Sequence, residues 1–205
     1  MIAELGHLAV IIAFMVAIVQ SVVPMIGASK GYIGWMDAAR PSAIIQFLLI
    51  FFAFIMLTIS FVTSDFSVKL VASNSHSLKP LLYKISGVWG NHEGSMLLWI
   101  LILAFYGALV AVFGKRLPII LKARVLSVQA MIGVAFIAFL LFTSNPFERL
   151  IFPPFDGKDL NPLLQDPGLA FHPPFLYFGY VGLSMTFSFA IAALIQGSVD
   201  AAWAR

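Results

Sequence analysis

One histidine in this sequence lies where its imidazole could serve as a ligand. His172 falls within a Pro- and Gly-punctuated segment, residues 161–182, and is followed directly by Pro173 and Pro174. The residue before a proline is biased towards extended backbone, and a proline suits the first turn of a helix. The pattern therefore predicts His172 just outside the start of a long apolar helix. Locally, an incidental histidine at a helix entry explains the pattern as well as a functional ligand does.

A second segment that could carry chemistry is WGNHEGS, residues 89–95, which precedes another apolar stretch. Asn91 is a candidate N-cap, and Glu93 would place an anion at a helix N-terminus, so helix capping alone explains both residues. The functional interpretation is that His92 or Glu93 contacts a substrate or a partner. Both interpretations stay open at this stage.

Other kinds of site have weaker support. Asp156, Asp159 and Asp166 do not have the spacing of an EF-hand loop, and no Walker A or dinucleotide fingerprint occurs. The chain has no cysteine, and zinc would need more His or Cys than one loop supplies. Haem iron is the better metal for His172, because one imidazole suffices as an axial ligand and apolar contact supplies most of the porphyrin's affinity.

The elements that must position these residues are membrane helices. Of the 205 residues, 61% are hydrophobic and 10% are charged, against roughly 25% charged in ordinary globular chains. Only helices satisfy the backbone within a span, so we expect an all-α polytopic membrane protein with about five transmembrane helices and two long outer-face loops. The N-terminus has no basic region and is interpreted as a retained span. The expected spans are residues 8–28, 42–62, 95–113, 125–143 and 175–195.

The distribution of cations predicts the orientation. Seven of the twelve Lys and Arg lie in residues 29–41, residues 114–124 and the C-terminal tail, and the other five lie in the long loops, residues 63–94 and 144–174. The positive-inside rule then places the N-terminus and both long loops outside. The cations form no basic stripe, so membrane topology explains them better than nucleic acid does. Residues 66–83 alternate apolar and polar side chains, as expected of an amphipathic interfacial segment.

Polar side chains within the spans are interpreted as contacts between helices. No charged residue falls inside any expected span, which disfavours an ion pathway or a small-molecule transporter. Four hydroxyl-bearing residues recur at steps of three and four, so they share one helical face. The residues assigned to helix packing are Tyr177, Tyr180, Ser184, Ser188, Gln46 and Gln129.

Three runs, GVWGNHEGSMLLWILILAFYG, NPF and DGKDLNPLLQDPGLAFHPPFLYFGYVG, resemble the N-terminal part of the CcmF family. This family supplies the haem lyase of the cytochrome c maturation system and belongs to the haem-handling membrane proteins. The resemblance extends over essentially the whole chain. It implies that His172, the histidine of the family's HPP motif, is an external axial ligand of haem iron. Candidate haem or partner contacts, without individual roles, are Trp89, Asn91, His92, Glu93, Pro173, Pro174 and Tyr177.

The resemblance also implies a function. The family joins haem vinyl groups to the two thiols of a CxxCH motif in apocytochrome c, so haem b is the substrate. A chain without cysteine fits, because these thiols belong to apocytochrome c. The implied partners are a periplasmic haem chaperone, apocytochrome c, other cytochrome c maturation membrane subunits and the remainder of the haem lyase. The implied location is the bacterial inner membrane, or the mitochondrial inner membrane if the chain is organellar.

The sequence departs from the family's full pattern. Family members continue with a Trp-rich outer segment, a second external histidine and intramembrane histidines for a bound haem b. Residues 1–205 contain none of these, and Trp203 begins no such segment. We therefore expect a fragment or a split-gene product, which does not complete the reaction alone. The alternatives are a paralogous haem lyase subunit for a multihaem nitrite reductase, and a structural subunit that docks partners without binding haem.

Overall fold

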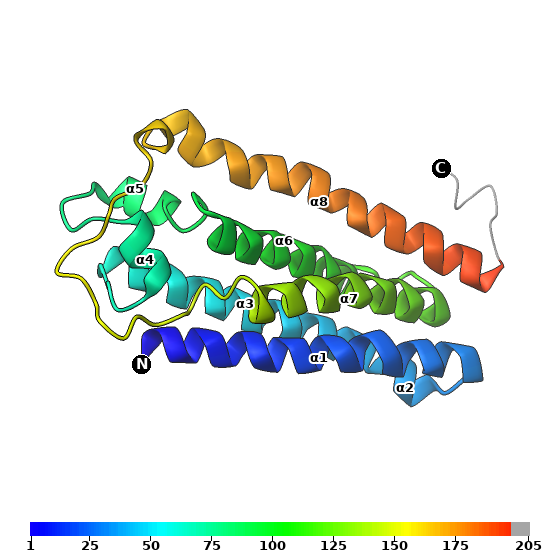
Figure 1. The fold of residues 1–205 in the computed structure, drawn as a ribbon. Helices are drawn as coiled ribbons and strands as arrows, with labels where there is room; N and C mark the ends of the chain where they lie inside the picture. The colour runs from blue at the N-terminus through cyan, green and yellow to red at the C-terminus, as the bar shows by residue number, and fades with distance from the viewer. Residues whose placement is uncertain (198–205) are drawn as a thin grey trace.

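The computed structural model describes residues 1–197, which fold into five long helices joined by shorter ones (Figure 1). The expectations for Trp203 and the C-terminal tail lie outside the described residues. One isolated antiparallel bridge pairs Val68 with Arg149. The long helices are α1 (Ile2–Lys30), α3 (Ala39–Val62), α6 (His92–Phe113), α7 (Ile119–Phe142) and α8 (Pro167–Gln196). The short ones are α2 (Ile33–Asp37), α4 (Lys69–Asn74), α5 (Leu81–Ser86) and the 3-10 helix η1 (Pro162–Leu164).

Each of the five predicted spans is a helix that is long and apolar enough to cross a membrane. The prediction of an all-α polytopic membrane protein is therefore confirmed. All five helices begin before the predicted spans, most of all α8, which begins at Pro167 instead of Phe175, whereas their C-terminal ends lie within two residues of the prediction. The hydropathy of a span reports its apolar length, whereas helix ends depend on capping residues that hydropathy does not detect.

The long helices pack as a bundle of α1, α3, α6 and α7, with α8 lying against α6 and α7 (Figure 1). Ala9, Ala13 and Ala17 of α1 are buried at steps of four. Small side chains let helix backbones approach closely, which is how membrane helices gain packing contacts. Larger side chains, including Leu57 and Leu97, fill the centre of the bundle.

Gln129 joins three of the helices. Its side-chain N–H donates to the Leu103 carbonyl of α6 at 3.2 Å and to the Ser184 hydroxyl of α8 at 3.0 Å, and its Oε1 accepts from Ser188 at 2.8 Å. The packing role predicted for these residues is confirmed. Tyr180 is the most exposed of the four hydroxyl-bearing residues, but it still lines a pocket together with Trp99 of α6 and Phe136 of α7.

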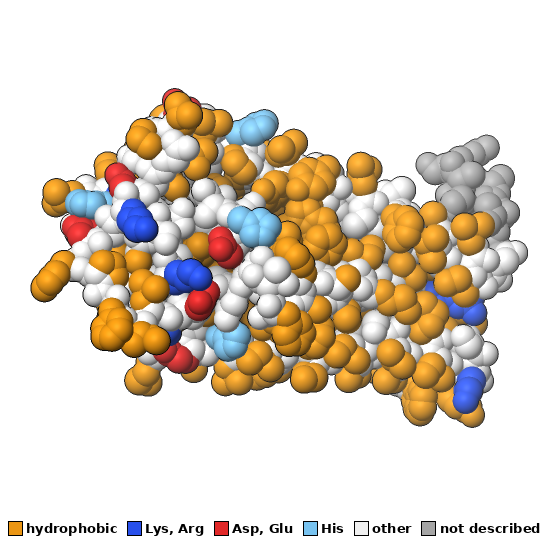
Figure 2. All heavy atoms as spheres, viewed as in Figure 1, with side chains coloured by type: hydrophobic (Ala, Val, Ile, Leu, Met, Phe, Trp, Pro, Cys, Tyr) orange, Lys and Arg blue, Asp and Glu red, His pale blue; other side chains and the backbone are white. Residues whose placement is uncertain are grey.

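The helix connections divide unequally between the two ends of the bundle. The N-terminus, α4, α5 and η1 lie together at one end, which we call the loop end (Figure 1). Acidic, basic and histidine side chains gather at the loop end, hydrophobic side chains cover the middle, and Lys and Arg reappear at the opposite end (Figure 2). The candidate residues therefore lie beside a polar surface at one end of an apolar bundle.

Candidate functional site

The start of α6 depends on Asn91 and Gly94. The Asn91 side chain accepts a hydrogen bond from the Gly94 N–H at 2.7 Å, so the predicted N-cap is confirmed. Its amide also donates to the Gly87 carbonyl at 2.7 Å. A Cβ on Gly94 would lie 1.7 Å from the Val88 carbonyl oxygen, so only glycine fits there. These contacts fix the turn that carries Trp89.

His92 and Glu93 diverge from this turn. The Nε2 of His92 lies 3.1 Å from the Ser144 hydroxyl, and its ring packs edge-on against Phe139 of α7. His92 shares a pocket of about 220 Å³ with Tyr177, whose hydroxyl is hydrogen-bonded to Ser95. Glu93 lines a separate polar depression of about 70 Å³. His92 and Tyr177 therefore line the same pocket, and Glu93 lines a different one.

The prediction that His172 lies just outside a helix is wrong. Helix α8 begins at Pro167, and the Asp166 side chain caps it by accepting from the Leu169 N–H at 3.2 Å. An Asp N-cap followed by proline at the first position is a strong start signal, and it outweighs the extended bias of a residue before proline. His172, Pro173 and Pro174 therefore lie inside the helix.

The tandem prolines interrupt the hydrogen bonding of α8. Proline has no N–H, so Pro174 cannot donate to the Ala170 carbonyl four residues earlier. Instead, the indole Nε1–H of Trp89 donates to that carbonyl at 2.9 Å. Ala170 is buried, and a buried carbonyl without a partner would be unfavourable. The turn before α6 thus supplies the donor that α8 lacks.

The imidazole of His172 is exposed at the loop end of α8. Among residues 1–197, no side chain is hydrogen-bonded to it. Phe175 and Leu176 follow at i+3 and i+4, so they share its face of the helix, and both are exposed. The structure therefore places an accessible imidazole next to an apolar helix surface.

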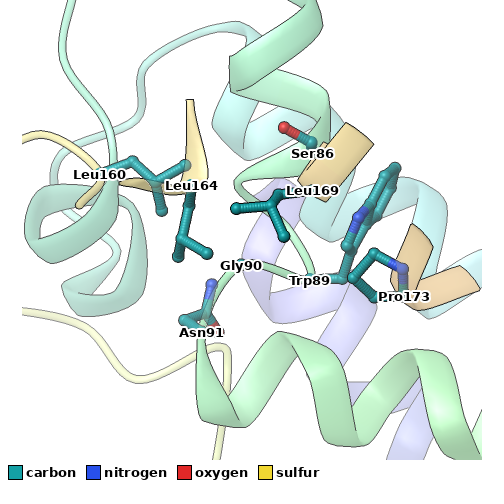
Figure 3. Close-up of a pocket in the computed structure, with 8 residues that line it drawn as sticks. All are labelled: Ser86, Trp89, Gly90, Asn91, Leu160, Leu164, Leu169 and Pro173. Atoms are coloured by element: carbon teal, nitrogen blue, oxygen red, sulfur yellow. The ribbon is translucent and has the colours of Figure 1, made fainter. Parts of the chain in front are cut away.

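A pocket of about 230 Å³ lies between the turn before α6, the η1 segment and the start of α8. Leu160 and Leu164 lie at one end of it, and Trp89 and Pro173 lie at the other (Figure 3). Of the candidate residues, it brings together Trp89, Asn91 and Pro173, while His172 lies outside it. The remaining lining residues are Ser86, Gly90 and Leu169.

Ion pairs tie the two long connections together at the loop end. Arg149 contacts Glu4 at 2.8 Å and Asp65 at 3.1 Å, which joins three distant segments. The Lys79 ammonium is buried, lies 2.9 Å from Asp159 and donates to the Asn74 carbonyl at 2.8 Å. Burial lowers the pKa of Lys79. Burial opposes ionisation of Asp159, but the hydrogen bonds from Lys79 and the Leu160 N–H lower the pKa of that carboxyl.

His76 and Asp156 make a further contact between these connections. The His76 Nε2 lies 3.3 Å from the Asp156 carboxylate, which also accepts hydrogen bonds from Ser77 and Gly157. The Ser77 hydroxyl, foremost among these partners, lowers the pKa of Asp156. The carboxylates weighed as metal ligands therefore have other structural roles: Asp156 and Asp159 pair with side chains, and Asp166 caps α8.

Several residues of the site were not found from the sequence. Leu160 and Leu164 line the pocket, and Ala170 accepts the indole hydrogen bond, although none of them carries a chemical signal of its own. Arg149 could have been noticed as one of few charged residues in an apolar chain. Its partners Glu4 and Asp65 lie 145 and 84 residues away, so sequence spacing could not identify them.

Comparison with known proteins gives consistent matches. Residues 89–201 match the family described as cytochrome C assembly protein. The chain is 68% identical over 205 residues to the cytochrome c-type biogenesis protein ccl1 of Rhodobacter capsulatus and 56% identical over 206 residues to CcmF of Pseudomonas aeruginosa. The alignments cover all of this chain and 31% of each relative. A solved structure of the cytochrome c haem lyase CcmF superposes with a TM-score of 0.85 at 28% identity, over 99% of this chain and 32% of that one.

Proposed function

The chain belongs to the cytochrome c assembly protein family, and from that membership we propose that it is the N-terminal transmembrane part of a haem lyase. It spans about a third of the length of the relatives that it matches, so the complete activity belongs to a larger assembly. In that assembly, a thiol of the apocytochrome CxxCH motif adds across a haem vinyl group. Sulfur bonds to one vinyl carbon and hydrogen to the other, so the addition needs no oxidant.

In this proposal His172 provides an axial nitrogen for the iron of the haem substrate. The observation that carries it is the exposed imidazole at the loop end of α8, beside the apolar side chains of Phe175 and Leu176. An axial imidazole holds the iron, and apolar surface accounts for much of the porphyrin's affinity. The residues present therefore fit haem. Phe171 is also exposed in this turn and extends the apolar surface.

The distribution of charge supports the proposed membrane topology. The chain is a multi-pass membrane protein, and we assign it to the bacterial inner membrane. The end of α6 and the start of α7 lie at the end opposite the loop end (Figure 1), and this connection and the first turns of α7 carry Lys115, Arg116, Lys122 and Arg124. With that end in the cytoplasm, the loop end faces the periplasm. There it would meet a haem chaperone, apocytochrome c, the other maturation subunits and the rest of the lyase.

The test is His172→Ala in the complete maturation system. We expect loss of the imidazole signature in the haem spectrum and at least a tenfold fall in mature cytochrome c. His76→Asn is the matched control: it removes a histidine from the same end of the bundle, where His76 pairs with Asp156. An unchanged haem spectrum together with normal maturation in His172→Ala would refute the ligand assignment.

A further inference from the structure

The hydrogen bond between Trp89 and Ala170 constrains the orientation of His172. Successive residues of a helix are about 100° apart, so His172 lies about 200° around α8 from Ala170. Ala170 is buried on the side that faces Trp89, and His172 is exposed on the far side. Any rotation of this turn about the helix axis would move the Ala170 carbonyl away from the indole and would turn the imidazole by the same angle.

Trp89 is itself held firmly. Its ring stacks on Phe54 of α3, with 6.4 Å between ring centroids and 13° between ring planes. Its backbone N–H donates to the Ser86 carbonyl at 3.1 Å, and Asn91 fixes the following residues as the N-cap of α6. The indole N–H therefore projects from a fixed point of the bundle towards α8 (Figure 3).

Elsewhere this end of α8 has few contacts with the bundle. From Phe171 to Leu176 each residue is exposed or half-buried, and the prolines remove two internal N–H donors from that segment. A helix segment that lacks such bonds bends more easily than an intact one. The bond from Trp89 is made to Ala170, directly before this weakened segment and two residues before His172.

We propose that Trp89 is a positioning residue for His172: its indole N–H holds the Ala170 carbonyl and thereby sets the direction in which the imidazole meets haem iron. This inference rests on the haem-ligand role assigned to His172 under the proposed function. Trp89 does not touch the iron and acts only through the backbone of α8. Pro174 contributes to this positioning, because its missing N–H leaves the Ala170 carbonyl free to accept the hydrogen bond from Trp89.

The first test replaces Trp89 by Phe in the complete lyase, which keeps an aromatic ring but removes the donor. The readout is the concentration of added imidazole that replaces the native ligand of ferric haem, followed by electron paramagnetic resonance. The loss of one hydrogen bond predicts that this concentration falls by about fivefold to tenfold. Trp35→Phe is the matched control, because Trp35 is an exposed indole at the opposite end of the bundle. We expect it to change nothing.

A second variant distinguishes two effects of the Trp89 hydrogen bond: it orients His172, and it gives the Ala170 carbonyl a donor. Pro174→Ala restores an N–H that can donate to Ala170 within the helix. In the double variant with Trp89→Phe, the carbonyl regains a donor but α8 is still not tied to the turn before α6. We expect the thermal stability to recover while the imidazole sensitivity stays high. Recovery of both would overturn the positioning role, and so would wild-type sensitivity in Trp89→Phe.

Two further outcomes complete the test. If Trp89→Phe does not fold, Pro174→Ala alone should show a smaller shift in the same direction, because its new N–H competes with the indole. No shift would then overturn the inference. If His172→Ala leaves the haem signature intact, the ligand assignment fails and the positioning role fails with it. If His172→Ala removes the signature but Trp89→Phe retains wild-type sensitivity, only the positioning role fails.

Discussion

Asp159→Asn should destabilise the loop end more than Lys79→Met does, although both changes break the same ion pair. The Lys79 side chain is 0% exposed and that of Asp159 is 41% exposed. Removing Asp159 leaves a buried ammonium, whereas removing Lys79 leaves a carboxylate that water reaches. Asp159 also has a positive φ of 72°, which asparagine tolerates well. The asparagine variant therefore removes the charge and keeps an oxygen that can accept from the Leu160 N–H; the other contact that it gives up is the longer hydrogen bond from Gln165, at 3.3 Å.

The structure sets the expected magnitude. Breaking a fully buried pair costs about 3–5 kcal/mol. Here the Asn74 carbonyl still accepts from Lys79, and Asp159 is partly hydrated, so we expect about 2–3 kcal/mol for Asp159→Asn. Lys79→Met should cost about 1 kcal/mol or less, since methionine fills the space of the buried lysine stem.

The assay is the free energy of unfolding of the full protein in detergent, measured for both single variants and for the double variant. In the double variant the Asp159→Asn change should cost almost nothing, because no buried ammonium is left unpaired. The reasoning would be refuted if Lys79→Met proved more destabilising than Asp159→Asn. Additive effects in the double variant would also contradict it.

Two further predictions concern single positions. Gly94→Ala should lower stability by more than about 2 kcal/mol, since its Cβ would clash with the Val88 carbonyl and break the cap of α6. Gly34→Ala, which has nothing within 4 Å, should leave the melting temperature almost unchanged. Asp156 has a pKa below its usual 3.8, so the stability that it contributes is present at neutral pH and is lost as pH falls below about 4. Unfolding measured between pH 7 and 3 should show this loss, and Asp156→Asn should weaken the dependence; an equal dependence in that variant would contradict the assignment to Asp156.

The sequence predicted the five spans because a run of apolar residues long enough for a bilayer has one common solution, the helix. It also predicted the cap at Asn91 and the packing role of Gln129, since both residue types have strong local preferences. The start of α8 was misplaced because two local rules competed there. The cap at Asp166 and Pro167 governed the backbone, and the tandem prolines at 173 and 174 were accommodated within the helix.

The pocket beside Trp89 and the hydrogen bond from Trp89 to Ala170 could not be predicted in this way. Trp89 and Ala170 lie 81 residues apart, and the residue type of Ala170 gives no sign that its carbonyl accepts an indole hydrogen bond. Leu160 and Leu164 resemble any other apolar residue of a loop. Such positions depend on how α6 and α8 dock, which is a property of the packed structure and not of local spacing.

The bridge between Val68 and Arg149 also bears on how the chain is made. Lys69 and its partner Glu148 are 79 residues apart, as are Ser77 and Asp156. At about 5–20 residues per second, synthesis of the intervening chain takes roughly 4–16 s. During that interval α6 and α7 enter the membrane, while the charged segment around α4 lacks its partners. The loop end is therefore completed by a segment that emerges only after α1, α3, α6 and α7 have been made.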